Sequence, residues 1–139
     1  MNDNAMLGRA VEIAEIAHQG QLDKVGEPYI EHCRRVAFAV PSADEKTVAY
    51  LHDVVEKARS WPMERLAAEG FPTKILEAVQ ALTRAAAESD EDFVRRAVRN
   101  DLARSVKIAD LNDNLVQTLQ VHGDVDRLLR DLIIARTAA

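Results

Sequence analysis

The sequence contains a single cysteine, Cys33, so no disulfide can form within the chain. A lone thiol fits a reducing compartment, and the expected location is cytoplasmic. The N-terminus, Met1-Asn2-Asp3-Asn4, carries no basic residue, so no signal peptide is predicted. No apolar run reaches the roughly 18–20 residues that a membrane span requires, so no membrane partner is expected.

Glycine, proline and aromatic residues are also scarce. Five glycines and four prolines in 139 residues offer too few turn positions for a fold of many short strands. Because aromatic side chains make up only 4% of the chain, the core is expected to consist of Ala, Val, Leu and Ile. The length suits one domain. We therefore predict an all-α protein, a compact helical bundle that forms a single domain over residues 1–139.

The chain lacks the excess of basic residues typical of nucleic-acid-binding proteins. Its formal net charge is −5, which disfavours broad electrostatic attraction to a phosphate backbone, so no nucleic acid partner is expected. An anionic small molecule can still bind where a metal or a local cluster of cations offsets the overall repulsion. The sequence leaves a homo-oligomer open.

Apolar residues recur at helical spacing along most of the chain, between Ser, Asp, Pro and Gly residues typical of helix ends. Residues 19–28 are expected to form a loop. Gly123 is expected to end a helix, and Asp124 to cap a final one that packs through Leu128, Leu129, Leu132 and Ile133. The other predicted helices run from after residues 2–4 to Ala17 or His18, over 30–40, from Ser42 or Asp44 to Lys57, over 62–69 and 72–83, and over 92–122 with an interruption near Asn100-Asp101.

His52, Asp53 and Glu56 lie close together on one of these predicted helices. Residues three and four apart on a helix share a face, with Cβ atoms about 5–6 Å apart, so Glu56 is expected beside both His52 and Asp53. The neighbouring residues are apolar, and burying uncompensated carboxylates costs several kcal/mol. A divalent cation would offset that cost. These apolar neighbours are Leu51, Val54 and Val55.

Two further residues, His32 and Asp110, are candidates to complete a metal site. Two imidazoles and two carboxylates suit Mn, Fe(II), Co or Zn, and they leave positions open for a water that the metal can acidify. Each residue also has an ordinary interpretation. His32 alone is more often a hydrogen-bonded core histidine, and Asp110 alone can form an ion pair with Lys107.

The order His32, His52-Asp53, Asp110 resembles the HD superfamily of metal-dependent phosphohydrolases. The similarity covers roughly residues 5–120, and it is strongest to the hydrolase domain of the Rel/SpoT alarmone enzymes, here as a small stand-alone form. The resemblance implies that His32, His52, Asp53 and Asp110 bind the metal, most often Mn²⁺. The segments that carry it are AHQGQLDKVGEPYIEH (17–32), LHDVVE (51–56), GF (70–71), ALT (81–83) and VKIADLNDN (106–114).

The same resemblance implies roles for residues around the metal. Glu56 would orient or deprotonate the attacking water, and Lys24, Tyr29 and Asn114 would line the nucleotide pocket. The implied reaction removes the 3′-pyrophosphate from guanosine tetra- or pentaphosphate (ppGpp or pppGpp), which yields GDP and pyrophosphate from ppGpp. The partner is therefore an anionic nucleotide, and Lys57, which follows Glu56, would belong to the catalytic group.

The chain departs from the alarmone hydrolases at four positions. Lys57 replaces an acid, and it could bind a phosphate instead of moving a proton. Asp23 replaces a basic residue before Lys24 and is expected to repel a phosphate. Cys33 replaces a proline and is expected to pack as a small hydrophobe, and Leu111 replaces an arginine. Two alternatives to ppGpp hydrolysis follow: an HD-type phosphohydrolase of another nucleotide, or a regulatory module that binds nucleotide without turnover.

Overall fold

The computed structural model describes residues 1–138, so Ala139, the last residue of the predicted domain, lies outside the described residues. Within residues 1–138 the chain forms nine helices and no strand, apart from an isolated bridge between Leu22 and Pro28. The predicted all-α class is confirmed. The helices are α1 (Asp3–Ala17), α2 (Tyr29–Phe38), α3 (Ala43–Leu51), α4 (Val54–Lys57), α5 (Met63–Ala68), α6 (Thr73–Ala81), α7 (Asp90–Ala97), α8 (Asp101–Gln120) and α9 (Asp126–Thr137).

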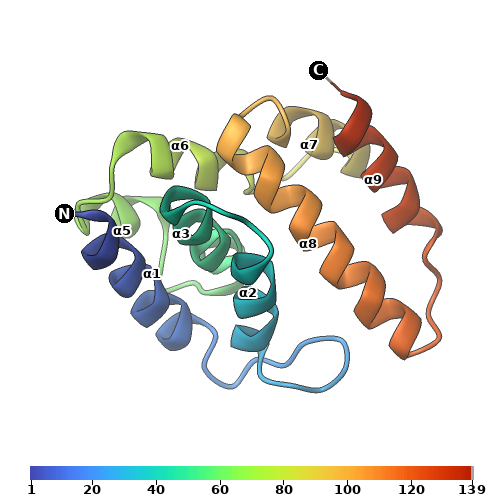
Figure 1. Cartoon of the computed structure of the whole chain (residues 1–139), viewed down its shortest axis with the longest axis horizontal. Coiled ribbons are helices and arrows are strands. Elements are labelled where there is room, and N and C mark those ends of the chain that lie inside the picture. The colour runs from blue at the N-terminus through green and yellow to red at the C-terminus, as the bar shows by residue number, and fades with distance from the viewer. Residues whose placement is uncertain (139) are drawn as a thin grey trace.

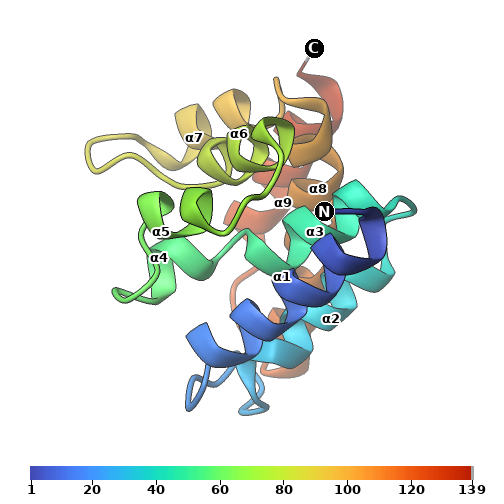
Figure 2. The same cartoon turned by 90° about the vertical axis from the view of Figure 1, so that its left-hand side faces the viewer.

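Helix α3 lies at the centre of the bundle and packs against α1, α2, α6 and α8. Figure 1 shows α8, the longest helix, crossing the molecule with α9 running back beside it. In Figure 2 the short helix α5 lies beside α6 at one edge of the molecule. Helices α2, α3 and α8 also pack against one another, so three segments distant in sequence meet at the centre of the fold.

Polar side chains cap four of the nine helices in residues 1–138. The side chains of Asn2, Ser42, Ser89 and Asn100 each accept a hydrogen bond from a backbone N–H in the first turn of α1, α3, α7 and α8. Such caps satisfy N–H groups that have no partner within the helix. The interruption predicted near Asn100-Asp101 is present, because α7 ends at Ala97 and Asn100 is the N-cap of α8.

Small aliphatic side chains fill most of the core, as predicted. One cluster of buried residues joins α1–α6 to α7 and α8, and a second lies between α7, α8 and α9. Trp61 is the largest fully buried side chain, and the Arg65 guanidinium lies 3.7 Å from the centre of its ring. No helix among residues 1–138 combines the length and apolar character needed to cross a membrane.

The predicted helix from Ser42 to Lys57 is wrong at its centre. Helix α3 ends at Leu51, and α4 starts at Val54, with His52 and Asp53 as the residues between them. Adjacent residues on a regular helix point about 100° apart because each turn takes 3.6 residues. The break lets both side chains point to the same place, with His52 Nε2 3.0 Å from Asp53 Oδ2.

The prediction for the last helix also needs correction. Helix α9 begins at Asp126, so Val125, not Asp124, is its N-cap, although Asp124 Oδ1 accepts a hydrogen bond from the Asp126 N–H. Leu129 and Ile133 are exposed, whereas Leu128 and Leu132 are buried. The buried face of α9 therefore includes Ile134 and Ala135 in place of the predicted Leu129 and Ile133.

Gly123 ends α8 for a reason other than backbone freedom. The residue with positive φ is His122, at 56°. A Cβ on Gly123 would lie 2.8 Å from Thr118 Cγ2, so the turn requires glycine because the chain passes close to α8.

Asp131 on α9 is a buried carboxyl that the sequence did not reveal. Its side chain is 1% exposed and lies 3.2 Å from Arg127 Nη1, which also contacts Asp90 at 3.3 Å. Burial and the neighbouring Asp90 raise the pKa of Asp131 to about 6. The pKa of Asp90 falls to about 2 despite its burial, because Asp131 and Arg84 hydrogen-bond to it. At mildly acidic pH the two carboxyls therefore share a proton.

This pair predicts a pH-dependent loss of stability. An acid whose pKa is raised in the folded state stabilises the fold fully at low pH, and it loses that contribution as the pH rises through the folded value. The unfolding free energy should therefore fall between pH 5 and pH 8 by on the order of 1 kcal/mol more in the wild-type chain than in Asp131→Asn. Urea denaturation at pH 5, 6, 7 and 8 measures this. Asp126→Asn, an exposed position on the same helix, should retain the wild-type slope, and an equal slope in Asp131→Asn would contradict the prediction.

Candidate metal centre

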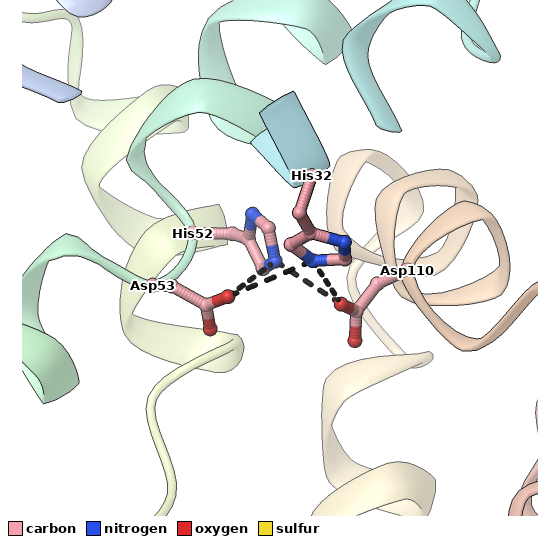
Figure 3. Close-up of side chains that lie close together, drawn as sticks. All are labelled: His32, His52, Asp53 and Asp110. Atoms are coloured by element: carbon pink, nitrogen blue, oxygen red, sulfur yellow. Dashed lines mark hydrogen bonds and ion pairs between the residues drawn. The ribbon is translucent and has the colours of Figure 1, made fainter. Parts of the chain in front are cut away.

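Four side chains from three separate segments converge where α2, α3 and α8 meet. His32 lies on the first turn of α2, His52 follows α3, Asp53 precedes α4, and Asp110 lies in the middle of α8. One potential ligand atom from each lies within 4.8 Å of all the others. Figure 3 shows both imidazole rings directed between the two carboxylates. The structure therefore brings together all four predicted metal ligands.

Hydrogen bonds on the outer side of each ring determine which nitrogen faces the cluster. His32 Nδ1 lies 2.6 Å from Asp113 Oδ2, and His52 Nδ1 lies against the carbonyl oxygen of Ala49. Both partners are acceptors, so both Nδ1 atoms carry the proton. The Nε2 atoms then face Asp110 Oδ1, at 3.0 Å from His32 and 3.3 Å from His52. This is the orientation in which an imidazole can bind a metal.

The cluster requires positive charge between its carboxylates. Burial lowers the pKa of His52, but Asp53 and Asp110 outweigh it and raise that pKa well above its usual value. Burial raises the pKa of Asp110, yet Lys107 and the two histidines bring it well below its usual value. Protons on the imidazoles or a cation can supply the charge, and a metal would replace those protons. Two nitrogen and two oxygen donors fit a divalent ion such as Mn²⁺ or Zn²⁺.

Two adjoining cavities open onto this cluster. The larger has a volume of about 310 Å³, and its lining includes Lys24, Tyr29 and Lys57. The smaller has a volume of about 150 Å³, and its lining includes Arg84 and Lys107. The two cavities share five lining residues, so each gives access to the same carboxylates. The shared residues are Asp53, Glu56, Asp110, Asn114 and Arg127.

A model of the HD domain matches residues 10–112. The chain belongs to the HD domain family. A solved structure with 23% sequence identity has the same fold, with a TM-score of 0.70 over 95% of this chain and 82% of the other; it is described as a metazoan ortholog of SpoT that hydrolyses ppGpp and plays a role in starvation responses. No curated protein matches the chain. The chain is thus an HD-domain phosphohydrolase with a candidate His/Asp metal site.

Two of the predicted nucleotide-binding residues hydrogen-bond directly to candidate metal ligands of this HD domain. The Tyr29 hydroxyl donates to Asp53 Oδ2, and Asn114 Nδ2 donates to Asp110 Oδ1 at 3.1 Å. Burial and the Asp53 charge raise the pKa of Tyr29, so its hydroxyl stays protonated. Both residues therefore help to orient the carboxylates as well as line the cavity.

Lys24, the third predicted nucleotide-binding residue, is held at the edge of the larger cavity. Its Nζ lies 3.2 Å from Thr118 Oγ1, and its backbone N–H donates to Gln117 Oε1 at 3.0 Å. Both partners belong to α8. The 19–28 loop that carries Lys24 is thereby fixed against the helix that supplies Asp110.

Glu56 and Lys57 are exposed and line the larger cavity. Because the helix breaks before Val54, Glu56 is not on a continuous helical face with His52, as the sequence had suggested. Glu56 Oε1 accepts a hydrogen bond from the Arg84 backbone N–H, which holds the side chain in the lining that both cavities share. Lys57 Nζ lies 4.9 Å from the centre of the Tyr29 ring, so its charge faces the cavity.

Asp23, predicted to repel a phosphate, lines the larger cavity with its charge paired to a cation. Its side chain is 1% exposed, and it forms an ion pair with Arg35 at 3.0 Å. Its other carboxylate oxygen accepts hydrogen bonds from the Val25 and Glu27 N–H groups. Burial acts against the charge, but these contacts lower the pKa of Asp23, so it remains an internally neutralised carboxylate that shapes the loop.

Cys33 packs as a buried hydrophobe, as predicted. Burial raises the pKa of its thiol to about 12, so the sulfur stays protonated and unreactive despite the nearby histidines.

Sequence reasoning missed two residues of the site. Asp113, three positions after Asp110, holds His32 in place, and this spacing on one helix was a usable signal. Arg127 lines both cavities, but it comes from α9, and nothing in its spacing marks it. With Arg84 and Lys107 it surrounds the smaller cavity with cations, whereas Arg34 and Arg35 point to acids elsewhere.

Proposed function

We propose that this HD-domain phosphohydrolase uses Mn²⁺ to remove the 3′-pyrophosphate of guanosine tetra- or pentaphosphate. The observation that carries the proposal is the set of cations facing the four-residue cluster: Lys24, Lys57 and Arg127 line the 310 Å³ cavity beside it. This volume lies at the lower end of the range typical of small-molecule sites. In a chain of net charge −5, such a concentration of cations favours an anionic substrate at this place.

In this proposal His32, His52, Asp53 and Asp110 hold the metal. When bound, Mn²⁺ would supply an acidified water and neutralise charge on the phosphoryl group. Tyr29 and Asn114 keep the two carboxylates oriented through their hydrogen bonds. These contacts fix the geometry on which attack at phosphorus depends.

The remaining steps belong to residues of the cavity. Glu56 accepts the proton of the attacking water, and the bond between phosphorus and the 3′-oxygen breaks. Lys57 stabilises the departing oxygen and can donate the proton that restores the 3′-hydroxyl. Arg84, Lys107 and Arg127 surround the smaller cavity, where the released pyrophosphate would lie.

Incubating the purified chain with Mn²⁺ and ppGpp tests the proposal. GDP and pyrophosphate should appear in equal amounts, quantified by ion-exchange chromatography. Release of single phosphates, or no product from ppGpp, would contradict it.

A second candidate is hydrolysis of another phosphorylated nucleotide. Lys57 in place of an acid favours it, because a cation there can bind a phosphate group of a different nucleotide. A panel of nucleoside monophosphates, deoxynucleotides and nucleotide pyrophosphates, assayed for phosphate and pyrophosphate release, separates the two candidates. Nucleotide-dependent thermal stabilisation with no product from any of them would instead indicate a regulatory binding module.

Lys57 should matter for substrate binding. A hydrogen bond to a charged group contributes about 1.5–3 kcal/mol, so Lys57→Ala should lower kcat/KM for the anionic nucleotide by roughly 10- to 100-fold. Steady-state kinetics measure the change. Lys74→Ala is the matched control, because Lys74 is an exposed lysine that pairs with Asp44 at the surface. Equal kcat/KM values for the two variants would show that Lys57 does not bind the substrate.

A further inference from the structure

The Arg35 guanidinium connects the loop that carries Lys24 to Asp113, the carboxylate that hydrogen-bonds to His32. Arg35 Nη2 lies 3.0 Å from Asp23 Oδ2 in the loop, and Arg35 Nε lies 2.7 Å from Asp113 Oδ1 on α8. Asp113 Oδ2 in turn accepts a hydrogen bond from His32 Nδ1 at 2.6 Å. A continuous chain of charged contacts therefore runs from the loop to a metal-facing imidazole.

The loop depends on this chain for its shape. Asp23 Oδ1 accepts hydrogen bonds from Val25 N–H at 3.1 Å and Glu27 N–H at 2.9 Å, which closes the turn. A second connection passes through Gln117, whose Oε1 accepts from the Lys24 N–H and whose Nε2 donates to Asp113 at 2.8 Å. Both connections end on the same carboxylate, Asp113.

The buried location of these groups makes the contacts strong. The side chains of Asp23 and Asp113 are 1% and 12% exposed, and one Arg35 guanidinium bonds to both. A carboxylate behind a metal-binding histidine fixes the ring and increases its basicity, and losing such a partner commonly lowers metal affinity 10- to 100-fold. Anything that changes how Arg35 shares its hydrogen bonds thus acts on the loop and on His32 together.

We propose that Arg35 is a positioning residue that couples the 19–28 loop to the metal centre, so that metal binding orders the loop and an ordered loop strengthens metal binding. The proposal rests on the metal site of the proposed function. Coupling of this kind is reciprocal, because each event must favour the other by the same factor. It would also strengthen the hold on Lys24 at the cavity edge when the metal is bound.

The test uses Mn²⁺ alone, without a nucleotide. In the wild-type chain, adding Mn²⁺ should slow amide hydrogen exchange at Val25 and Glu27 about tenfold, because their N–H groups bond to Asp23. In Arg35→Met this metal-dependent protection should disappear, and Mn²⁺ affinity, measured by calorimetry, should fall about tenfold. Arg34→Met is the matched control, because Arg34 pairs only with Glu15 and Glu31 in the described chain.

A second variant separates coupling from general damage to the fold. Asp23→Asn removes the ion pair between the loop and Arg35 but leaves Asp113 bonded to His32. This variant should therefore lose the metal-dependent protection with a smaller loss of Mn²⁺ affinity. Metal-dependent protection that persists in both Arg35→Met and Asp23→Asn would overturn the coupling while leaving the proposed function intact. Absence of Mn²⁺ binding by the wild-type chain would overturn the metal site, and the coupling with it.

Discussion

Replacing Asp53 with alanine should reduce kcat/KM for hydrolysis about 100- to 1,000-fold without unfolding the protein. Asp53 supplies one of the four convergent donors, and its Oδ2 is the acceptor for the Tyr29 hydroxyl. Its loss leaves His52 Nε2 facing Asp110 alone, so a metal would lose a ligand and its orientation together. Removing groups that stabilise developing charge typically costs about 3–4 kcal/mol of transition-state stabilisation.

The control for this variant lies on the neighbouring helix. Asp44→Ala removes a carboxylate from the first turn of α3, where it pairs with Lys74 at 2.7 Å, far from the cluster at the other end of that helix. Steady-state assays of the two variants, with circular dichroism to verify their helical content, measure the difference. If Asp53→Ala kept more than about a tenth of wild-type activity, the metal mechanism at this site would be wrong.

Removing the metal should abolish activity and lower thermal stability. A ligand that binds only the folded state stabilises it by about 2.7–4.1 kcal/mol when present at 100 to 1,000 times its dissociation constant. For a chain of this length, that corresponds to a rise in Tm of roughly 10 °C between chelator and Mn²⁺. The physical reason is that the carboxylates and imidazoles, buried together, otherwise need protons to balance their charge.

Differential scanning calorimetry in EDTA, followed by re-addition of Mn²⁺, measures this shift. The Asp53→Ala chain should show almost no Mn²⁺-dependent change in Tm, because its site has lost a ligand. A Tm that is the same in EDTA and in Mn²⁺ for the wild-type chain would contradict metal binding at this site, and so would an equal shift in Asp53→Ala.

Local sequence signals predicted the helical class and most helix starts because those features depend on neighbouring residues. Ser42 caps α3 through a hydrogen bond from the Glu45 N–H three positions away, and this pattern is visible in the sequence. The break at His52-Asp53 was not visible in this way. The segment is compatible with a helix, and tertiary contacts such as the one between Glu56 and the Arg84 backbone accompany the change in direction.

The residues of the sequence motif were predicted, whereas residues that reach the site through tertiary packing were missed. The convergence of His32, His52, Asp53 and Asp110 followed from their resemblance to HD enzymes. Arg127 reaches the cavities only because α9 runs back along α8, and no local pattern predicts this arrangement. The ion pair of Asp23 was missed for a similar reason, because its partner Arg35 lies twelve residues away on another element.

Anomalous diffraction from crystals grown with Mn²⁺ would locate the metal. We expect one strong peak at the manganese edge, with His32 Nε2, His52 Nε2 and one oxygen each of Asp53 and Asp110 at about 2.0–2.3 Å. No peak at this position, or a manganese ion bound elsewhere with these four side chains unchanged, would contradict this expectation.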